Sequence, residues 1–283
     1  MAQLRESSFE VALGESVLSL RAAGEEVVVE TTRRTVRAGL VLDSRWQPDR
    51  SAERGSAPRL VQHFAGSWVS TDAPTFDPGI ATLMDFADSR DEVHFYYVLP
   101  FDEHRALVES TGFGPRPWGA ERHDRCLAEH LEKRWPGRAF TVHRREQGVI
   151  PMDVRPPTRQ ESPGIVPIGL RGGAARPSTG YAFLGIQRQA ASIAQALAEG
   201  KPVSALRPFS RSTSMLDAIF LSLARRRPGA LPGVLVSLFR NADPARLVRF
   251  LAGGGSIADA LHVVARTPPV PMLREAGSML VRA

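Results

Sequence analysis

The sequence has one cysteine, Cys126, in 283 residues. This excludes a disulfide framework and any metal cluster held by several thiolates. The sequence also lacks an apolar run of the roughly 18 residues that a membrane-spanning helix needs. Its first 15 residues carry charges where a signal peptide requires an apolar segment. We therefore expect a cytoplasmic protein of a reducing compartment, either soluble or bound at a membrane surface.

Lysine is nearly absent: 34 of the 36 basic residues are arginine, and two are lysine. The positive charge is concentrated at one end: residues 196–283 hold 12 basic and 5 acidic residues, whereas residues 1–195 hold 24 and 25. No aromatic stacking platform or nucleic-acid-binding motif accompanies the basic segment, so nucleic acid is not an expected partner. The arginines at 225–227 are either a solvated helix end or part of a surface attracted to an anionic membrane.

The hydrophobic fraction of 43% and the charged fraction of 23% are typical of a globular protein. β-rich segments dominate the first half, and a helical, basic region forms the C-terminal end. A helix end is expected before residue 27, a linker at residues 48–58, and a Gly/Pro-rich region at 146–181. Strands are expected at residues 27–30, 36–42, 60–64, 81–86, 93–99, 106–111 and 140–145, and helices at 125–135 and 183–199.

Three features are candidates for chemistry on the residues alone. A glycine-rich loop at residues 171–181 opens the helix at 183–199, so it is either a ligand-binding backbone segment or a plain turn with a helix cap. Glu109 shares a strand face with Leu107 and Thr111, so it is either a carboxyl with a raised pKa or a solvent-facing residue. Glu146 lies beside a predicted tight turn, which is equally typical of a plain hairpin loop.

Other common site types are not indicated. The seven histidines show no metal-binding spacing, and His123 and His130 lie seven residues apart on one predicted helix. The sequence contains neither a P-loop nor a Gly-x-Ser-x-Gly nucleophile motif. We therefore expect no metal site.

Several sequence blocks, taken in order over residues 36–275, together identify a family. These blocks are Leu42-Asp43-Ser44-Arg45, Gln62-His63-Phe64 with Gly66 and Trp68, Thr75-Phe76-Asp77-Pro78, Ala81-Thr82-Leu83-Met84-Asp85-Phe86, Phe95-Tyr96-Tyr97-Val98-Leu99-Pro100, Leu107-Val108-Glu109-Ser110-Thr111, Glu146-Gln147-Gly148-Val149-Ile150-Pro151-Met152, residues 169–181, Arg249-Phe250-Leu251-Ala252 and Pro268-Pro269-Val270-Pro271. In this order and spacing the sequence resembles the bacterial flavin-dependent lycopene β-cyclases of carotenoid biosynthesis.

The resemblance implies a mixed α/β (α+β) fold, in which a partial Rossmann-like FAD-binding domain is interrupted by a β-rich substrate domain and followed by a helical C-terminal region. The expected division is a remnant of the nucleotide-binding domain at 1–47, the substrate domain at 48–155, a return to the FAD domain at 156–200, and the basic helical region at 201–283. The resemblance also implies that Asp43, Gly172, Gly173, Thr179 and Gly180 lie at the cofactor.

The implied activity is acid-catalysed cyclisation of lycopene ends to the β-rings of β-carotene. It is an isomerisation of the intramolecular-lyase type without net redox change, and it uses reduced FAD with NAD(P)H as the reductant. Glu109 aligns with the first acid of the family's Phe-Leu-Glu-Glu-Thr-like motif and is the expected acid/base; Ser110 stands where a second acid is usual. Glu146 and Asp85 are secondary candidates, either as structural residues or as residues that support the acid from a second layer. Because lycopene dissolves in lipid, the implied location is the cytoplasmic membrane surface.

The family's N-terminal Gly-x-Gly-x-x-Gly turn has no counterpart, and Gly253-Gly254-Gly255 stands in the wrong context. We expect a truncated chain, or one half of a split enzyme that needs a separate N-terminal nucleotide-binding segment to bind flavin. Two alternatives stay open: another flavoprotein of the same superfamily, such as a monooxygenase or a cyclase for a different carotenoid end, and a non-catalytic helper chain.

Overall fold

The computed structural model describes residues 9–45, 60–86, 92–154, 162–203 and 209–268, together with Met272, Glu275 and Gly277. The predicted linker at 48–58, the predicted boundaries near residues 47 and 155, and most of the proline-rich block at 268–271 lie outside these residues. Within the described ranges, no helix combines the length and the apolarity that crossing a bilayer requires.

The described chain begins with an antiparallel three-stranded sheet. It consists of β1 (Val17–Ala23), β2 (Glu26–Thr31) and β3 (Thr35–Ala38). The prediction of a helix end before residue 27 is wrong, because this segment is β1, which pairs with the β-branched residues of β2. Gly24, with φ +67°, makes the tight turn between the two strands.

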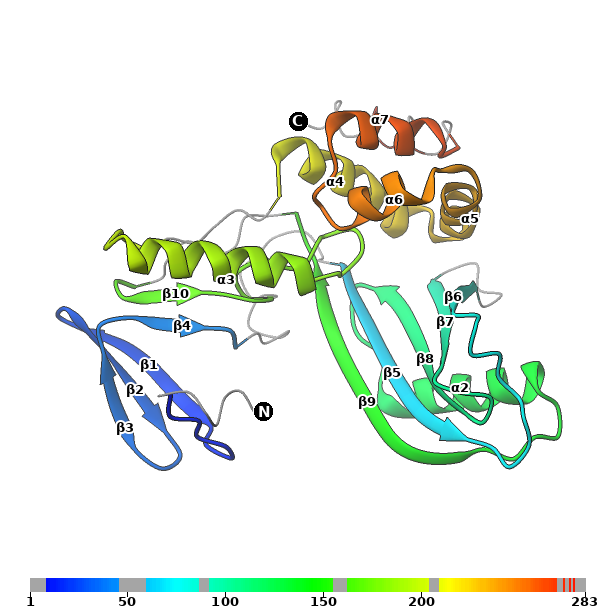
Figure 1. Cartoon of the computed structure of the whole chain (residues 1–283), viewed down its shortest axis with the longest axis horizontal. Coiled ribbons are helices and arrows are strands. Elements are labelled where there is room, and N and C mark those ends of the chain that lie inside the picture. Colours follow the sequence, from blue (N-terminus) through cyan, green and yellow to red (C-terminus); the bar gives the residue numbers. More distant parts are fainter. Residues whose placement is uncertain are drawn as a thin grey trace.

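A parallel strand pair follows the small sheet. The strand predicted at residues 36–42 is in fact two strands, since the chain leaves the small sheet after β3 and forms β4 (Val41–Asp43) beside β10 (Ile165–Pro167). The predicted helix at 183–199 is confirmed as α3 (Phe183–Ala198). In Figure 1, α3 runs along this strand pair.

A five-stranded antiparallel sheet forms the largest unit, in the order β6-β7-β8-β5-β9. The tight turn or hairpin loop predicted beside Glu146 is wrong, because residues 146–152 continue the edge strand β9. Gly148 allows this because the Phe64 ring of β5 occupies the space that a side chain would take, and Pro151 is tolerated at an edge. The strands are β5 (Leu60–Ser70), β6 (Thr82–Phe86), β7 (Val93–Pro100), β8 (Arg105–Gly114) and β9 (Thr141–Met152).

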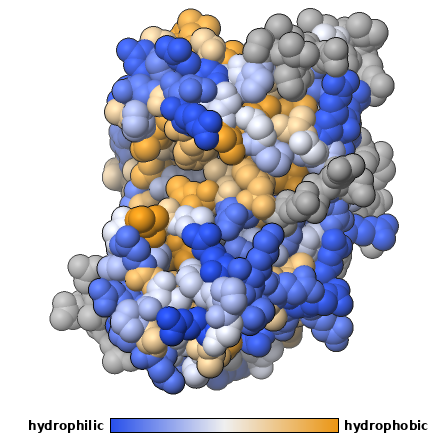
Figure 2. Space-filling model, turned by 90° about the vertical axis from the view of Figure 1, so that its right-hand side faces the viewer, coloured by the Kyte–Doolittle hydropathy of each residue, from blue (hydrophilic) through white to orange (hydrophobic). Residues whose placement is uncertain are grey.

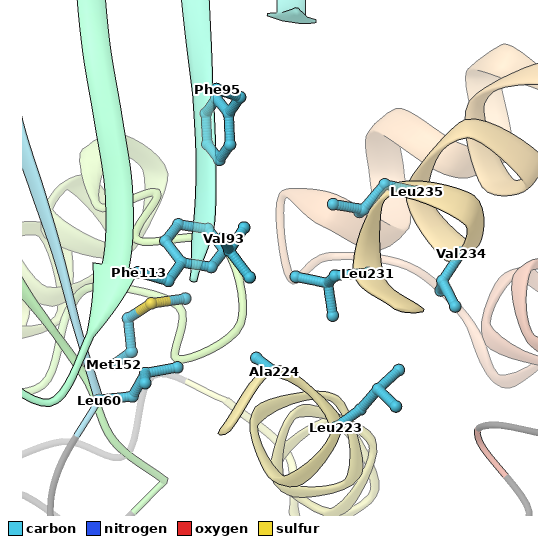
Figure 3. Close-up of a cluster of buried hydrophobic side chains, with 10 residues drawn as sticks. All are labelled: Leu60, Val93, Phe95, Phe113, Met152, Leu223, Ala224, Leu231, Val234 and Leu235. Carbon is cyan, nitrogen blue, oxygen red and sulfur yellow. The ribbon is translucent and has the colours of Figure 1, made fainter. Parts of the chain in front are cut away.

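Helices pack against this sheet from two sides. Helix α2 (Ala120–Arg134) begins five residues earlier than predicted and covers one face, where Leu127 joins a core with Tyr96 and Val108. The opposite face meets a helical cluster, defined as α4 (Arg211–Arg226), α5 (Leu231–Asn241), α6 (Pro244–Leu251) and α7 (Ile257–Ala265). Figure 3 shows this contact: Phe95 and Phe113 from the sheet lie opposite Leu231 and Leu235 of α5.

Candidate functional site

Glu109 lies in the middle of β8, on the sheet face that points away from α2. Its side chain is half-buried and accepts a hydrogen bond from Thr111 Oγ1 at 2.5 Å. Burial is the main cause of a raised pKa at Glu109; the hydrogen bond from Thr111 lowers this pKa, and the charge of Glu146 raises it further. A carboxyl in these surroundings keeps its proton to higher pH than an exposed glutamate and can act as a general acid.

Aromatic side chains of β7 and β8 share the sheet face that carries Glu109. Tyr97 of β7 lies directly opposite Glu109 in the strand register, and burial followed by the charge of Glu109 raises its pKa to about 12. Phe95 packs edge-to-face on both Tyr97 and Phe113, with ring centroids 5.3 and 5.5 Å apart. Aromatic faces stabilise a nearby cation and exclude water. The face therefore offers a proton donor beside groups suited to positive charge on an apolar molecule.

Glu146 lies on the same face as Glu109. Both residues are register partners of Gly66, Glu109 from β8 and Glu146 from β9. The Trp68 indole donates to Glu146 Oε2 at 3.3 Å. Asp85, the other secondary candidate, faces away from this group: it is the register partner of Tyr96 on the α2 side and pairs with Arg134 at 3.6 Å.

The glycine-rich loop meets the sheet at one end of this face. Gly180, with φ +69°, lies against β5, where an added Cβ would stand 2.7 Å from Gln62 Oε1. That oxygen is buried and accepts no hydrogen bond from the described residues. Gln62 precedes Gly66 by four residues on one strand face, so the loop reaches the sheet about 13 Å along the strand from the Glu109 row.

The other predicted loop residues have different surroundings. Gly173 has φ +71°, which a side chain would strain. An added Cβ at Gly172 would stand 2.5 Å from Pro167 O and 2.7 Å from Gln189 Nε2, so packing within the chain accounts for this glycine. Thr179 lines a cavity of about 80 Å³ between the loop and the helical cluster. Gly180 packs against Gln62 and Ile150, which lie on the face that carries Glu109.

Asp43 is held by two arginines at the carboxyl end of β4. Its carboxylate receives hydrogen bonds from Arg45 Nε at 2.9 Å and from Arg45 Nη2 at 3.1 Å, and it pairs with Arg171 of the glycine-rich loop. Burial alone would raise the pKa of Asp43, but the Arg45 hydrogen bonds and the charges of both arginines lower it below its ordinary value. Asp43 thus joins the β4–β10 pair to the start of the loop.

The α2 side of the sheet holds a buried polar chain that sequence reasoning missed. His63 Nδ1 lies 3.1 Å from His123 Nε2, and Ser110 Oγ lies 2.9 Å from both His123 Nδ1 and His94 Nε2. Strand alternation predicts that Ser110 and Glu109 point to opposite faces of the sheet, but it could not show that two other strands and a helix bring histidines to Ser110. Among the described residues, no group of three or more metal-binding side chains is arranged to hold an ion.

The described residues fit part of a flavin site. Gly173 and Gly180 adopt positive-φ conformations that favour glycine, and Gln62 Oε1 offers a buried acceptor beside Gly180. The cradle for the cofactor's pyrophosphate, a strand, glycine turn and helix, is not present among the described residues.

Comparison with known proteins identifies the family of this chain. The family model described as lycopene cyclase protein matches residues 5–277. Over 255 residues the chain is 31% identical to the lycopene beta-cyclase of Paracoccus sp. (strain N81106 / MBIC 01143), an alignment that covers 84% of this chain and 63% of that relative. The chain therefore spans less than two thirds of that relative's length.

Solved structures show the same fold at low identity. A flavoprotein/dehydrogenase from Cytophaga hutchinsonii matches with a TM-score of 0.55 at 14% identity, over 100% of this chain and 73% of that chain. A geranylgeranyl bacteriochlorophyll reductase-like protein from Thermoplasma acidophilum matches with a TM-score of 0.53 at 13% identity, over 92% and 68%. The fold is thus mixed α/β with a partial Rossmann-like unit. The family match over nearly the whole length shows that this chain belongs to the lycopene cyclase family.

Proposed function

We propose that this chain carries the catalytic face of a lycopene β-cyclase. The observation that carries the proposal is Glu109, a half-buried carboxyl with a raised pKa that lies beside Tyr97 on the five-stranded sheet. Family membership supports the same activity. A hydrocarbon substrate has no polar group to bind, so the site must act on its double bonds, and an apolar face with one proton donor suits this task.

In the proposed reaction the Glu109 carboxyl transfers its proton to the terminal double bond of lycopene. This leaves the Glu109 carboxylate and a tertiary carbocation, and the neighbouring double bond attacks the cation to close a six-membered ring. The ring cation then returns a proton to Glu109, which forms the β-ring double bond and restores the acid. Atoms and electrons balance without net oxidation. Tyr97 lies next to Glu109 on this face, where its ring would stabilise the developing positive charge.

We propose that Gly173, Thr179 and Gly180 line the FAD site, with Gln62 beside the loop. Gly172 and Asp43 then shape the loop from within, since their own contacts are to the chain. FAD kept reduced by NAD(P)H would supply negative charge near the cation. Among the described residues, Gln62 Oε1 is a buried acceptor without a hydrogen-bond partner at that end of the sheet.

The rest of the nucleotide domain is proposed to come from a separate N-terminal segment. An apolar hollow of about 420 Å³ lies along α3, lined by Ile186, Ile193 and Leu197 and by Leu42 of β4. Parallel sheets are normally buried on both faces. Beside the β4–β10 pair, however, Leu42, Ile186 and Leu197 are exposed to solvent in the described structure. A strand–helix unit that extends the β4–β10 pair would fill the hollow.

Peripheral membrane binding is proposed for the helical cluster. Figure 2 shows apolar surface on this side of the molecule, around the helical cluster and the sheet below it. On α5, Val236 and Phe239 are exposed next to the exposed Arg240, and α7 exposes Ile257 and Leu261. Apolar side chains beside arginines suit an anionic lipid surface, from which the enzyme could draw its substrate.

Glu109→Gln tests the proposed function. The amide keeps the size of the side chain but cannot give up a proton as the acid does, so ring formation should stop while flavin binding persists. The gene is introduced together with its genomic surroundings into a lycopene-accumulating host, and the carotenoids that the host forms are separated by chromatography. Asp85→Asn, on the opposite sheet face, is the matched control and should leave β-carotene formation intact. An unchanged β-carotene yield in Glu109→Gln would rule out Glu109 as the acid.

A further inference from the structure

Four residues form a row straight across the sheet. Tyr97 of β7 faces Glu109 of β8, Glu109 faces Gly66 of β5, and Gly66 faces Glu146 of β9. Register partners point to the same side of a sheet, so Tyr97, Glu109 and Glu146 share the apolar face. The backbones of Glu109 and Glu146 lie two strand spacings apart, about 10 Å, with only a glycine between them.

The Glu146 side chain leans over that glycine. A Cβ added to Gly66 would stand 3.1 Å from Glu146 Cγ and 3.4 Å from Glu146 Oε1, and 3.0 Å from Leu107 Cδ1 of β8. The side chain of Glu146 therefore occupies the space above β5, on the way to β8. The indole of Trp68, two residues from Gly66, donates to the other carboxylate oxygen at 3.3 Å and holds it in this direction.

The charges around Glu109 single out Glu146. Tyr97, with a pKa of about 12, is neutral at physiological pH, and Thr111 donates a neutral hydrogen bond. Arg144 precedes Glu146 by two residues, but its guanidinium lies over the Trp68 ring and the residue is exposed. Among the described residues, Glu146 is the charged group whose field acts on the Glu109 carboxyl.

We propose that Glu146 is a positioning residue for proton transfer, because it supplies from across Gly66 the second carboxylate that keeps the proton on Glu109. This inference rests on the proposed function of Glu109 as the acid. Ser110 stands directly after Glu109, where the family's motif has its second acid. Its side chain points to the other face of the sheet and forms hydrogen bonds with His94 and His123. The sheet register brings a carboxylate to the correct face from a strand 37 positions further along.

A direct titration tests the inference without relying on cyclisation. The enzyme is expressed with its genomic surroundings and with ¹³C-labelled glutamate carboxyls. The carboxyl chemical shifts are followed by NMR as pH changes, and the signal that disappears in Glu109→Gln is assigned to Glu109. In Glu146→Gln the midpoint of Glu109 should move to lower pH, whereas Glu146→Asp, which keeps the charge, should leave most of the effect in place. Glu129→Gln removes the same charge from α2 on the opposite face and should not move the midpoint.

The pH profile of cyclisation is the second readout. Activity of a general acid falls as pH rises through its pKa, so Glu146→Gln should move this loss of kcat/KM to lower pH while the rate at the acidic plateau persists. An unmoved Glu109 midpoint in Glu146→Gln, or an equal shift in Glu129→Gln, would overturn the inference. If the parent enzyme forms no β-rings, the proposed function fails, but the titration still decides whether the two carboxylates are coupled.

Discussion

The buried histidine chain between the sheet and α2 should make this protein unusually sensitive to mild acid. His63 and His94 are 1% and 5% exposed, and both lie within the hydrogen-bonded chain through His123 and Ser110. Burial, reinforced by the positive charges of neighbouring histidines and of Arg122, lowers the pKa of His63 to about 3 and that of His94 to about 4. Both rings therefore stay neutral in the folded protein well below pH 6.

The sign of the effect follows from proton binding. In the unfolded chain these histidines titrate near pH 6.5, so the unfolded state binds more protons between pH 6.5 and about 4. Their contribution to stability is complete above pH 6.5 and is lost as pH falls. Between pH 7.5 and pH 5 the free energy of unfolding falls by about 2 kcal/mol for each histidine, because below pH 6.5 it changes by roughly 1.4 kcal/mol per pH unit. The pair loses about 4 kcal/mol, a large share of a typical folding free energy of about 5–15 kcal/mol.

Urea unfolding followed by tryptophan fluorescence measures this effect. Trp118 packs against His63 and His94 with ring centroids 5.0 and 4.8 Å apart, so its emission reports on this part of the structure. His94→Gln removes one titrating group and should reduce the difference in unfolding free energy between pH 7.5 and pH 5 by about 2 kcal/mol, whatever its stability at pH 7.5. His143→Gln, at an exposed position on β9, is the control. A pH dependence that is the same in His94→Gln and in the parent chain would refute the reasoning.

Two further predictions concern the glycine-rich loop and the membrane. Arg176 and Asp217 form a buried ion pair at 3.0 Å that ties the loop to α4, so Arg176→Met should cost about 3–5 kcal/mol in urea unfolding, and adding Asp217→Leu should recover much of it; equal stability of the single variant and the parent would contradict this. The protein should float with anionic vesicles at low salt and much less at 1 M salt, where the Debye length is about 3 Å. Val236→Ser with Phe239→Ser should weaken flotation further, and a protein that stays in the soluble fraction at low salt would exclude the membrane proposal.

Local patterns predicted the parts of this protein that depend on neighbours in sequence. Apolar spacing predicted α3, and strand alternation placed Leu107, Glu109 and Thr111 on one face, which the hydrogen bond from Thr111 to Glu109 confirms. Local patterns failed where pairing decides the outcome. Residues 17–23 became a strand because β2 pairs with them, and residues 146–152 became a strand because β5 pairs with them.

The sequence by itself determined the family and excluded a disulfide within the chain, and it predicted Glu109 as the acid. These depend on residue identity and order along the chain. Only the tertiary structure decided what stands beside that acid: Tyr97 opposite it, Glu146 across Gly66, and histidines behind Ser110. The physical reason is register. A shift of one residue in a strand would turn the side chains of that strand to the other face, and pairing between distant strands sets the register.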